Sequence, residues 1–289
     1  MSTEKEVKSL AFFNSIYKSK PPVTRSKFRM NLGRLYFTCH RYLQWIFNSD
    51  VSYVTTIDRV KLPHLVANHR TPLYRKLRKV DMWLQKNKVN NLKLAAGRID
   101  GLVLNPGETF SFWRSVGKPT KTKGYLEGMV LNNGTFAPGV GGGLCQLSNL
   151  IYWMILHTPL TVVERWRHTY DVFPDSNRTQ PFGSGATVVY NYIDLQIRND
   201  TKYRYQLAVN VGKSDLEGEL RCEKPCPYEF EVYEKEHIIT QEWWGGYMRH
   251  NIIRRRVFNI EGIQIDDEFI TENHAIMMYE PMLENTMIL

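Results

Sequence analysis

A glycine-rich loop that runs directly into an amphipathic segment constrains this chain more than any other feature. The loop contains Gly141, Gly142 and Gly143, and the segment that follows it begins with Cys145. Apolar residues recur after Cys145 at steps of three and four, which predicts a helix with one buried face. Cys145 is therefore expected in the first helical turn, beside backbone N–H groups that lack a partner within the helix.

Cys145 has two interpretations. Free N–H groups and the helix dipole favour negative charge, which would lower the pKa of the thiol and make Cys145 a candidate nucleophile. Free cysteine also packs commonly as a small buried hydrophobe, and a glycine run before a helix can be only a tight turn. The glycines would let another backbone or a substrate approach closely, so Gly141, Gly142 and Gly143 are candidate substrate-binding residues.

Composition indicates a globular protein in a reducing compartment. The chain has 289 residues, of which 43% are hydrophobic, enough for one or two domains with a core. We find no secretory signal, and four cysteines do not form a disulfide framework, so we expect a cytoplasmic location. Cys222 and Cys226 lack two further zinc ligands at a typical spacing, and we expect no metal and no cofactor.

Positive charge is concentrated in the first third of the chain. Residues 1–100 contain 20 Lys and Arg against 6 Asp and Glu, a net +14, whereas the whole chain carries +9. Residues 28–47 have the spacing of an amphipathic basic helix, which could lie on an anionic membrane or dock onto the rest of the chain. A basic face that only aids solubility is the other alternative. No nucleic-acid motif accompanies the charge, so we do not expect a nucleic-acid partner.

Patterns before the loop predict two helices, a strand and a hairpin. Thr71 and Pro72 have the character of an N-cap and a first helical residue, and residues 92–100 indicate a second helix. Residues 50–61 favour a strand because they are rich in β-branched residues and tyrosine. A turn at residues 132–134 between strand-like flanks predicts a hairpin immediately before the glycine-rich loop.

Two strands predicted after the Cys145 helix carry further candidate residues. Residues 161–168 have the pattern of a strand that ends at His168. Residues 186–197 form the strongest strand pattern in the chain, apolar on both sides, with Asp194 in its middle. A carboxylate in a buried strand requires a positive or hydrogen-bonding partner, which a histidine on a neighbouring strand would provide.

Cys145, His168 and Asp194 match the roles of cysteine-dependent catalysis: a thiolate, a histidine that carries the proton, and a group that orients the histidine. Gln146 could contact the reacting carbonyl, and the backbone N–H groups at Cys145 and Gln146 could form an oxyanion hole. This order resembles the core of papain-like and transglutaminase-like enzymes. The alternative is a histidine satisfied in a core and an aspartate that holds a turn or an arginine, because spacing alone does not bring three residues together.

Several sequence motifs occur together in this chain, at residues 105–112, 124–125, 141–148, 164–168, 186–188, 192–195 and 271–276. As a set, they resemble the VanW family of vancomycin B-type resistance accessory proteins. The resemblance is dense over residues 92–199 and implies a cell-envelope and glycopeptide context without a settled reaction. Many members carry an aspartate where this chain has Gly185, so Asp194 is the carboxylate that remains.

We therefore expect an α+β protein with helices packed on a mostly antiparallel sheet. Its parts would be a basic helical region at 1–64, a VanW-like domain at 65–224 and a β-rich region at 225–289. One predicted function is a cysteine hydrolase or acyltransferase acting on amide or peptide bonds of a peptidoglycan precursor. The other is a non-enzymatic module that binds such a precursor, another peptide-like small molecule or a partner protein. The oligomeric state is left open.

Overall fold

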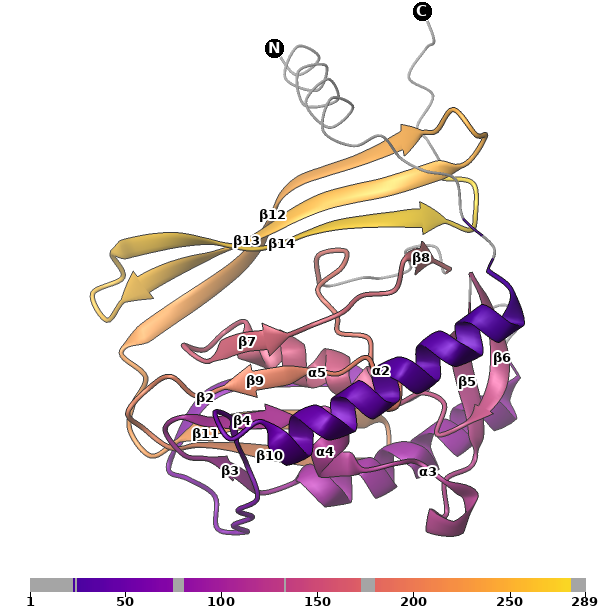
Figure 1. The fold of residues 1–289 in the computed structure, drawn as a ribbon. Helices are drawn as coiled ribbons and strands as arrows, with labels where there is room; N and C mark the ends of the chain where they lie inside the picture. The colour runs from indigo at the N-terminus through magenta and orange to yellow at the C-terminus, as the bar shows by residue number, and fades with distance from the viewer. Residues whose placement is uncertain (1–22, 24, 75–80, 133, 173–179, 282–289) are drawn as a thin grey trace, which may run out of the picture.

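The computed structural model describes residues 23, 25–74, 81–132, 134–172 and 180–281, and it confirms the α+β class. Helices and sheets of the central part lie below a layer of three long C-terminal strands (Figure 1). The helices of the described residues, besides one 3-10 turn, are α2 (Lys27–Phe47), α3 (Met82–Ile99), α4 (Phe112–Val116) and α5 (Cys145–Ile155).

The described strands form three four-stranded sheets and one hairpin. The sheet orders are β1-β4-β9-β7, β2-β11-β10-β3 and β12-β13-β14-β8, and β5 pairs with β6. The strands are β1 (Ser52–Tyr53), β2 (His64–Pro72), β3 (Leu102–Leu104), β4 (Glu108–Ser111), β5 (Glu127–Asn132), β6 (Thr135–Val140), β7 (Thr161–Glu164), β8 (Tyr170–Asp171), β9 (Gln196–Arg198), β10 (Tyr205–Val211), β11 (Asp215–Cys222), β12 (Tyr228–Gln241), β13 (Tyr247–Asn259) and β14 (Gln264–Met277).

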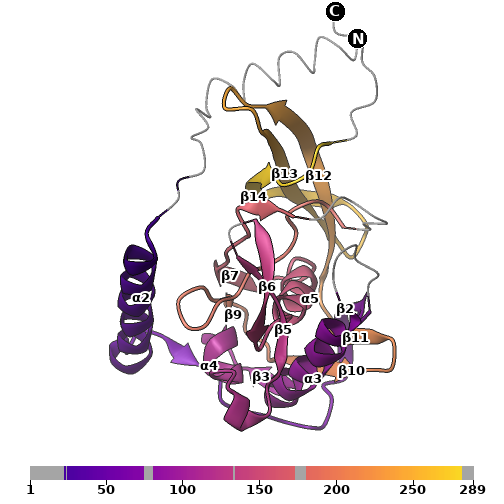
Figure 2. The same cartoon turned by 90° about the vertical axis from the view of Figure 1, so that its right-hand side faces the viewer.

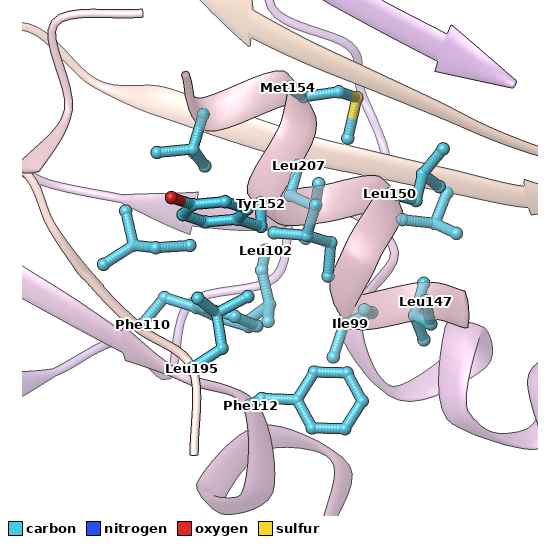
Figure 3. Packing of buried hydrophobic residues seen from close by; sticks show 14 of the residues in the cluster. Ile99, Leu102, Phe110, Phe112, Leu147, Leu150, Tyr152, Met154, Leu195 and Leu207 are labelled. Atoms are coloured by element: carbon cyan, nitrogen blue, oxygen red, sulfur yellow. The ribbon is translucent and has the colours of Figure 1, made fainter. Parts of the chain in front are cut away.

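The core forms where α5 packs between the first two sheets. Leu147, Leu150 and Met154 follow the helical repeat along α5, and each is at most 1% exposed. They meet side chains from the sheets, including Phe110 of β4 and Leu207 of β10 (Figure 3). The predicted helix after the glycine-rich loop is therefore confirmed, because its apolar stripe has two sheets to pack against.

Two predicted elements before the loop are wrong in part. Residues 64–72 form strand β2, paired with β11, so no helix begins at Thr71. The segment 50–61 contains only the two-residue strand β1 and an isolated bridge at Ile57. Elsewhere the predictions are confirmed: the helix expected at 92–100 lies within the longer α3, and the hairpin is β5 paired with β6.

The strand predicted at residues 186–197 is also wrong for most of its length. Only Gln196–Arg198 form a strand, β9. Before it, the chain turns on itself, since the N–H groups of Tyr192 and Ile193 both donate to the carbonyl of Val189. A run of apolar residues with no alternation indicates that the segment is buried. A buried irregular segment and a central strand both give this pattern, so the pattern does not distinguish them.

The C-terminal strands hold the end of α5. Arg255 of β13 donates through Nη1 to the carbonyls of Leu156, at 3.0 Å, and Thr158, at 2.8 Å. Arg255 also pairs with Glu268 on the neighbouring strand β14. Carbonyls at the end of a helix lack partners within it, so Arg255 both satisfies them and links the two layers. The division of the chain into three domains stays a prediction.

Candidate functional site

The glycine-rich loop lies against the chain's own backbone. A Cβ atom on Gly142 would overlap the backbone of Gly128, and the carbonyl of Gly142 accepts a hydrogen bond of 3.0 Å from Asn91. Gly143 has a φ of +95° and lies against the side chain of Lys88. The expected close approach is thus made by β5 and α3, and a role of Gly141, Gly142 and Gly143 in binding a substrate stays a prediction.

Gly142→Ala should lower the free energy of unfolding by about 2 kcal/mol or more, because the new methyl group would force β5 away from the loop. Gly97→Ala is the matched control. Outside its chain neighbours and the backbone of α3 itself, no atom lies within 4 Å of a Cβ position on Gly97, so alanine there should stabilise the helix by up to ~1 kcal/mol. Urea unfolding of both variants would measure the difference, and equal effects would contradict the close packing at Gly142.

Cys145 is the first residue of α5, as the sequence predicts. Its Sγ atom lies 3.6 Å from the carbonyl oxygen of Val188, the acceptor of a weak hydrogen bond. Burial raises the pKa of the Cys145 thiol, although that hydrogen bond opposes the effect. The helix terminus therefore does not produce a thiolate at neutral pH in this structure.

Gln146 connects α5 to the edge of a sheet. Its Nε2 atom donates to Oγ1 of Thr71 at 2.8 Å and to the carbonyl of Pro72 at 3.0 Å. Both acceptors belong to β2, so the amide nitrogen serves the packing of α5 against that strand. The contact of Gln146 with a reacting carbonyl stays a prediction.

His168 does not lie on a strand, because β7 ends at Glu164. The intervening residues adopt an irregular path along which Arg165 donates to the carbonyl of Gly185 at 2.9 Å. Burial lowers the pKa of His168 to about 4, and the charge of Arg167 adds to this effect. The imidazole is therefore neutral at pH 7, and the position expected for it by strand alternation is wrong.

Asp194 is fully buried and has its own partners. Its Oδ2 accepts from the Ser111 hydroxyl at 2.6 Å, and its Oδ1 accepts from the backbone N–H groups of Trp113 at 3.0 Å and Leu195 at 2.9 Å. Burial raises the pKa of Asp194 to about 6, and the hydrogen bonds from Ser111 and Trp113 oppose this. The partner expected for a buried carboxylate exists, but it is neither a histidine nor an arginine.

The predicted triad is not connected in this structure. Between described residues, no hydrogen bond or ion pair joins Cys145, His168 and Asp194 to one another. The Asp194 carboxylate instead holds the first turn of α4, where Ser111 is the N-cap residue. Catalysis by these residues stays a prediction.

Glu164 is a polar centre that the sequence analysis missed. Its carboxylate accepts from Arg41 at 2.5 Å, from Gln196 at 2.9 Å and from the indole N–H of Trp166 at 3.0 Å. The backbone N–H of Asp194 donates to it as well, at 3.2 Å. A glutamate that ends an otherwise apolar strand was the available signal.

Comparison with known proteins places these residues in one family. Residues 87–221, which include Cys145, His168 and Asp194, match the family described as "VanW like protein". The chain is 36% identical to "Vancomycin B-type resistance protein VanW" of Enterococcus faecalis, over 78% of this chain and 82% of that one. The chain belongs to the VanW family.

A second relative matches the chain over a shorter stretch. "Uncharacterized protein YoaR" of Bacillus subtilis is 36% identical over 39% of this chain and 36% of its own length. No solved structure matches the chain. The family assignment therefore rests on sequence similarity.

Beyond the matched VanW residues, strands β13 and β14 carry a buried polar cluster. Their register places His250 opposite His274 and Asn251 opposite Asn273. The Nδ1 atoms of the two histidines are 2.6 Å apart, and Asn273 donates to Asn251 at 2.8 Å. Arg165 also donates to Asn273, at 3.3 Å, so the cluster reaches back to the VanW residues. This cluster was not predicted from the sequence, although two polar residues in succession within each strand were a signal.

A hollow of about 360 Å³ opens at the far end of α5 from Cys145. Trp153, Tyr228 and Phe230 supply aromatic walls, and His157 and Glu229 supply polar groups. The hollow also borders residues 66–68 of β2. The hollow therefore lies beside β2 and β12, and each of these is the outer strand of its described sheet.

Proposed function

We propose that this protein acts in resistance to vancomycin, the role for which its Enterococcus faecalis relative is named. We further propose that it acts by binding the peptide of a peptidoglycan precursor and not as a cysteine enzyme. The hollow between β2 and β12 is the observation that carries this proposal. Outer strands offer backbone groups to an extended peptide, and neighbouring pockets select its side chains.

The lining of the hollow suits a peptide. Trp153 and Tyr228 offer broad apolar surfaces at low entropic cost, while Glu229 offers an acceptor for an amine or amide. Burial lowers the pKa of His157, so its imidazole is neutral at pH 7. The Nδ1 atom of His157 lies 2.9 Å from the carbonyl of Trp153, so Nδ1 carries the proton and Nε2 is an acceptor.

The ligand experiment titrates a synthetic peptidoglycan stem peptide into the full chain by calorimetry. Binding should weaken about tenfold in Glu229→Gln, since a hydrogen bond to a charged group contributes ~1.5–3 kcal/mol. Glu231→Gln on the same strand is the control, because Glu231 faces Arg256 and does not line the hollow. Absence of binding, or equal weakening in both variants, would exclude this peptide site.

Thiol labelling tests the enzymatic alternative. Iodoacetamide should modify the exposed Cys39 first and the folded chain's Cys145 much more slowly, because burial raises the pKa of Cys145 and hides its sulfur. Mass spectrometry of the labelled peptides gives both rates, with the urea-unfolded chain as the reference. Faster labelling of Cys145, with a pH midpoint below ~8.5, would favour the cysteine enzyme.

A further inference from the structure

Helix α2 meets the rest of the protein through the face that carries Arg41 and the partly buried Trp45. Arg41 is the buried residue of this helix, and it pairs with Glu164 at 2.5 Å. One turn later, the backbone carbonyl of Trp45 accepts a hydrogen bond of 3.3 Å from Arg114. Figure 2 shows α2 along the outside of the molecule, beside the sheets and not between them.

The apolar stripe of α2 faces away from the protein. Phe28, Leu35 and Ile46 are 77%, 60% and 70% exposed. At 3.6 residues per turn, these positions lie roughly opposite Arg41 on the helix. A helix that packs on its own protein ordinarily buries its apolar face, so this arrangement is the reverse of the usual one. Further large apolar residues exposed on α2 are Leu32, Tyr36, Phe37, Leu43 and Phe47.

The positive charge around α2 indicates what kind of surface covers this apolar stripe. The sequence has no acidic residue between Glu6 and Asp50. Arg25, Lys27 and Arg29 are exposed around the start of α2. A surface both apolar and basic repels a second copy of itself, whereas it complements a layer of anionic headgroups over hydrocarbon.

We propose that α2 lies flat on an anionic lipid bilayer, with its apolar stripe at the boundary between headgroups and acyl chains. The helix has 21 residues, a length of ~30 Å, and its polar side keeps the protein attached through Arg41. Within the described ranges, no helix combines the length and apolar character needed to cross a membrane. Binding in the plane of the surface is the mode that a basic amphipathic helix adopts.

Vesicle sedimentation with the full chain tests this inference. We expect binding to vesicles of phosphatidylcholine and phosphatidylglycerol, weaker binding to phosphatidylcholine alone, and loss of much of the difference at high salt. Leu35→Ser with Leu43→Ser should weaken binding by on the order of tenfold per residue. The control is Ile260→Ser with Ile263→Ser, which removes two exposed isoleucines from the turn between β13 and β14.

A second pair of variants tests the contribution of charge. Arg25→Gln combined with Arg29→Gln should weaken vesicle binding roughly fivefold per residue. Lys86→Gln with Lys93→Gln on α3 is the control with the same net charge. All eight substituted residues are exposed, so the four double variants should keep the native melting temperature. No vesicle binding by the native chain, or equal effects of test and control variants, would overturn the proposal.

A fluorescent label on Cys39 distinguishes a lipid surface from other molecules or segments that could cover the apolar stripe of α2. It lies on the apolar side of α2 and is an exposed free thiol, so it can carry an environment-sensitive fluorophore in a Cys226→Ser background. The emission should shift to shorter wavelength only when anionic vesicles are added. A shift without vesicles that grows with protein concentration would show a second copy on the stripe. A concentration-independent shift would show another part of the chain there, and either result would overturn the proposal.

Discussion

Asp171→Asn should lower the free energy of unfolding by about 3–5 kcal/mol, because it removes a negatively charged partner of a buried arginine. The Asp171 and Arg249 side chains are each 8% exposed, and Oδ2 lies 3.3 Å from Nη1. Arg249 also lies over the Phe182 ring, 4.3 Å from its centroid, so its charge cannot reach water without breaking this packing. Chemical denaturation at pH 7 measures the loss.

A surface ion pair in the same sheet provides the comparison for Asp171. Arg256 and Glu231 are 3.0 Å apart, with side chains 37% and 53% exposed. Glu231→Gln should cost less than ~1 kcal/mol, because water solvates the arginine that remains. If Asp171→Asn cost no more than Glu231→Gln, the pair at Arg249 would not hold the C-terminal strands to β8.

Asp194→Ala should lower the free energy of unfolding by about 3–5 kcal/mol at pH 5. The change leaves three buried donors without an acceptor, the Ser111 hydroxyl and the N–H groups of Trp113 and Leu195, at about 1–3 kcal/mol each. Asp194→Asn should cost less, because Oδ1 still accepts from the two N–H groups. Similar small losses in both variants would contradict the role of Asp194 in holding α4.

The contribution of Asp194 to the free energy of unfolding should fall as the pH rises. Burial raises its pKa from 3.8 to about 6, so the folded state keeps the proton to a higher pH than the unfolded chain. The stability that this group contributes is complete below pH ~4 and is lost as pH rises through 6, by ~3 kcal/mol in all. Asparagine does not titrate, so Asp194→Asn should be most costly near pH 4 and least costly near pH 7.

Denaturation curves of the wild type and Asp194→Asn between pH 4 and pH 7 test this decrease. The stability difference between the two proteins should shrink steadily as the pH rises. A constant difference would show that Asp194 has the same pKa in the folded and unfolded states. A growing difference would indicate a pKa lowered by the Ser111 and Trp113 hydrogen bonds, with burial as the smaller effect.

Local sequence patterns determined several elements and the place of the candidate cysteine. The spacing of Leu147, Leu150 and Met154 defines α5, because one helical stripe requires only a single apolar layer to pack against. The turn before Thr135 defines the hairpin of β5 and β6 through its own backbone. The motifs around Cys145 were likewise sufficient to identify the VanW family, which the comparisons confirmed.

The partners of the charged residues were decided only by the tertiary structure. Residue order suggested His168 for Asp194, yet the chain folds Ser111 and Trp113 against that carboxylate. Likewise, the amphipathic pattern of α2 was compatible with docking or with a membrane, and the ion pair of Arg41 with Glu164 turned the apolar stripe outward. Periodicity specifies which face of an element is apolar, but what that face meets depends on contacts between residues more than a hundred positions apart.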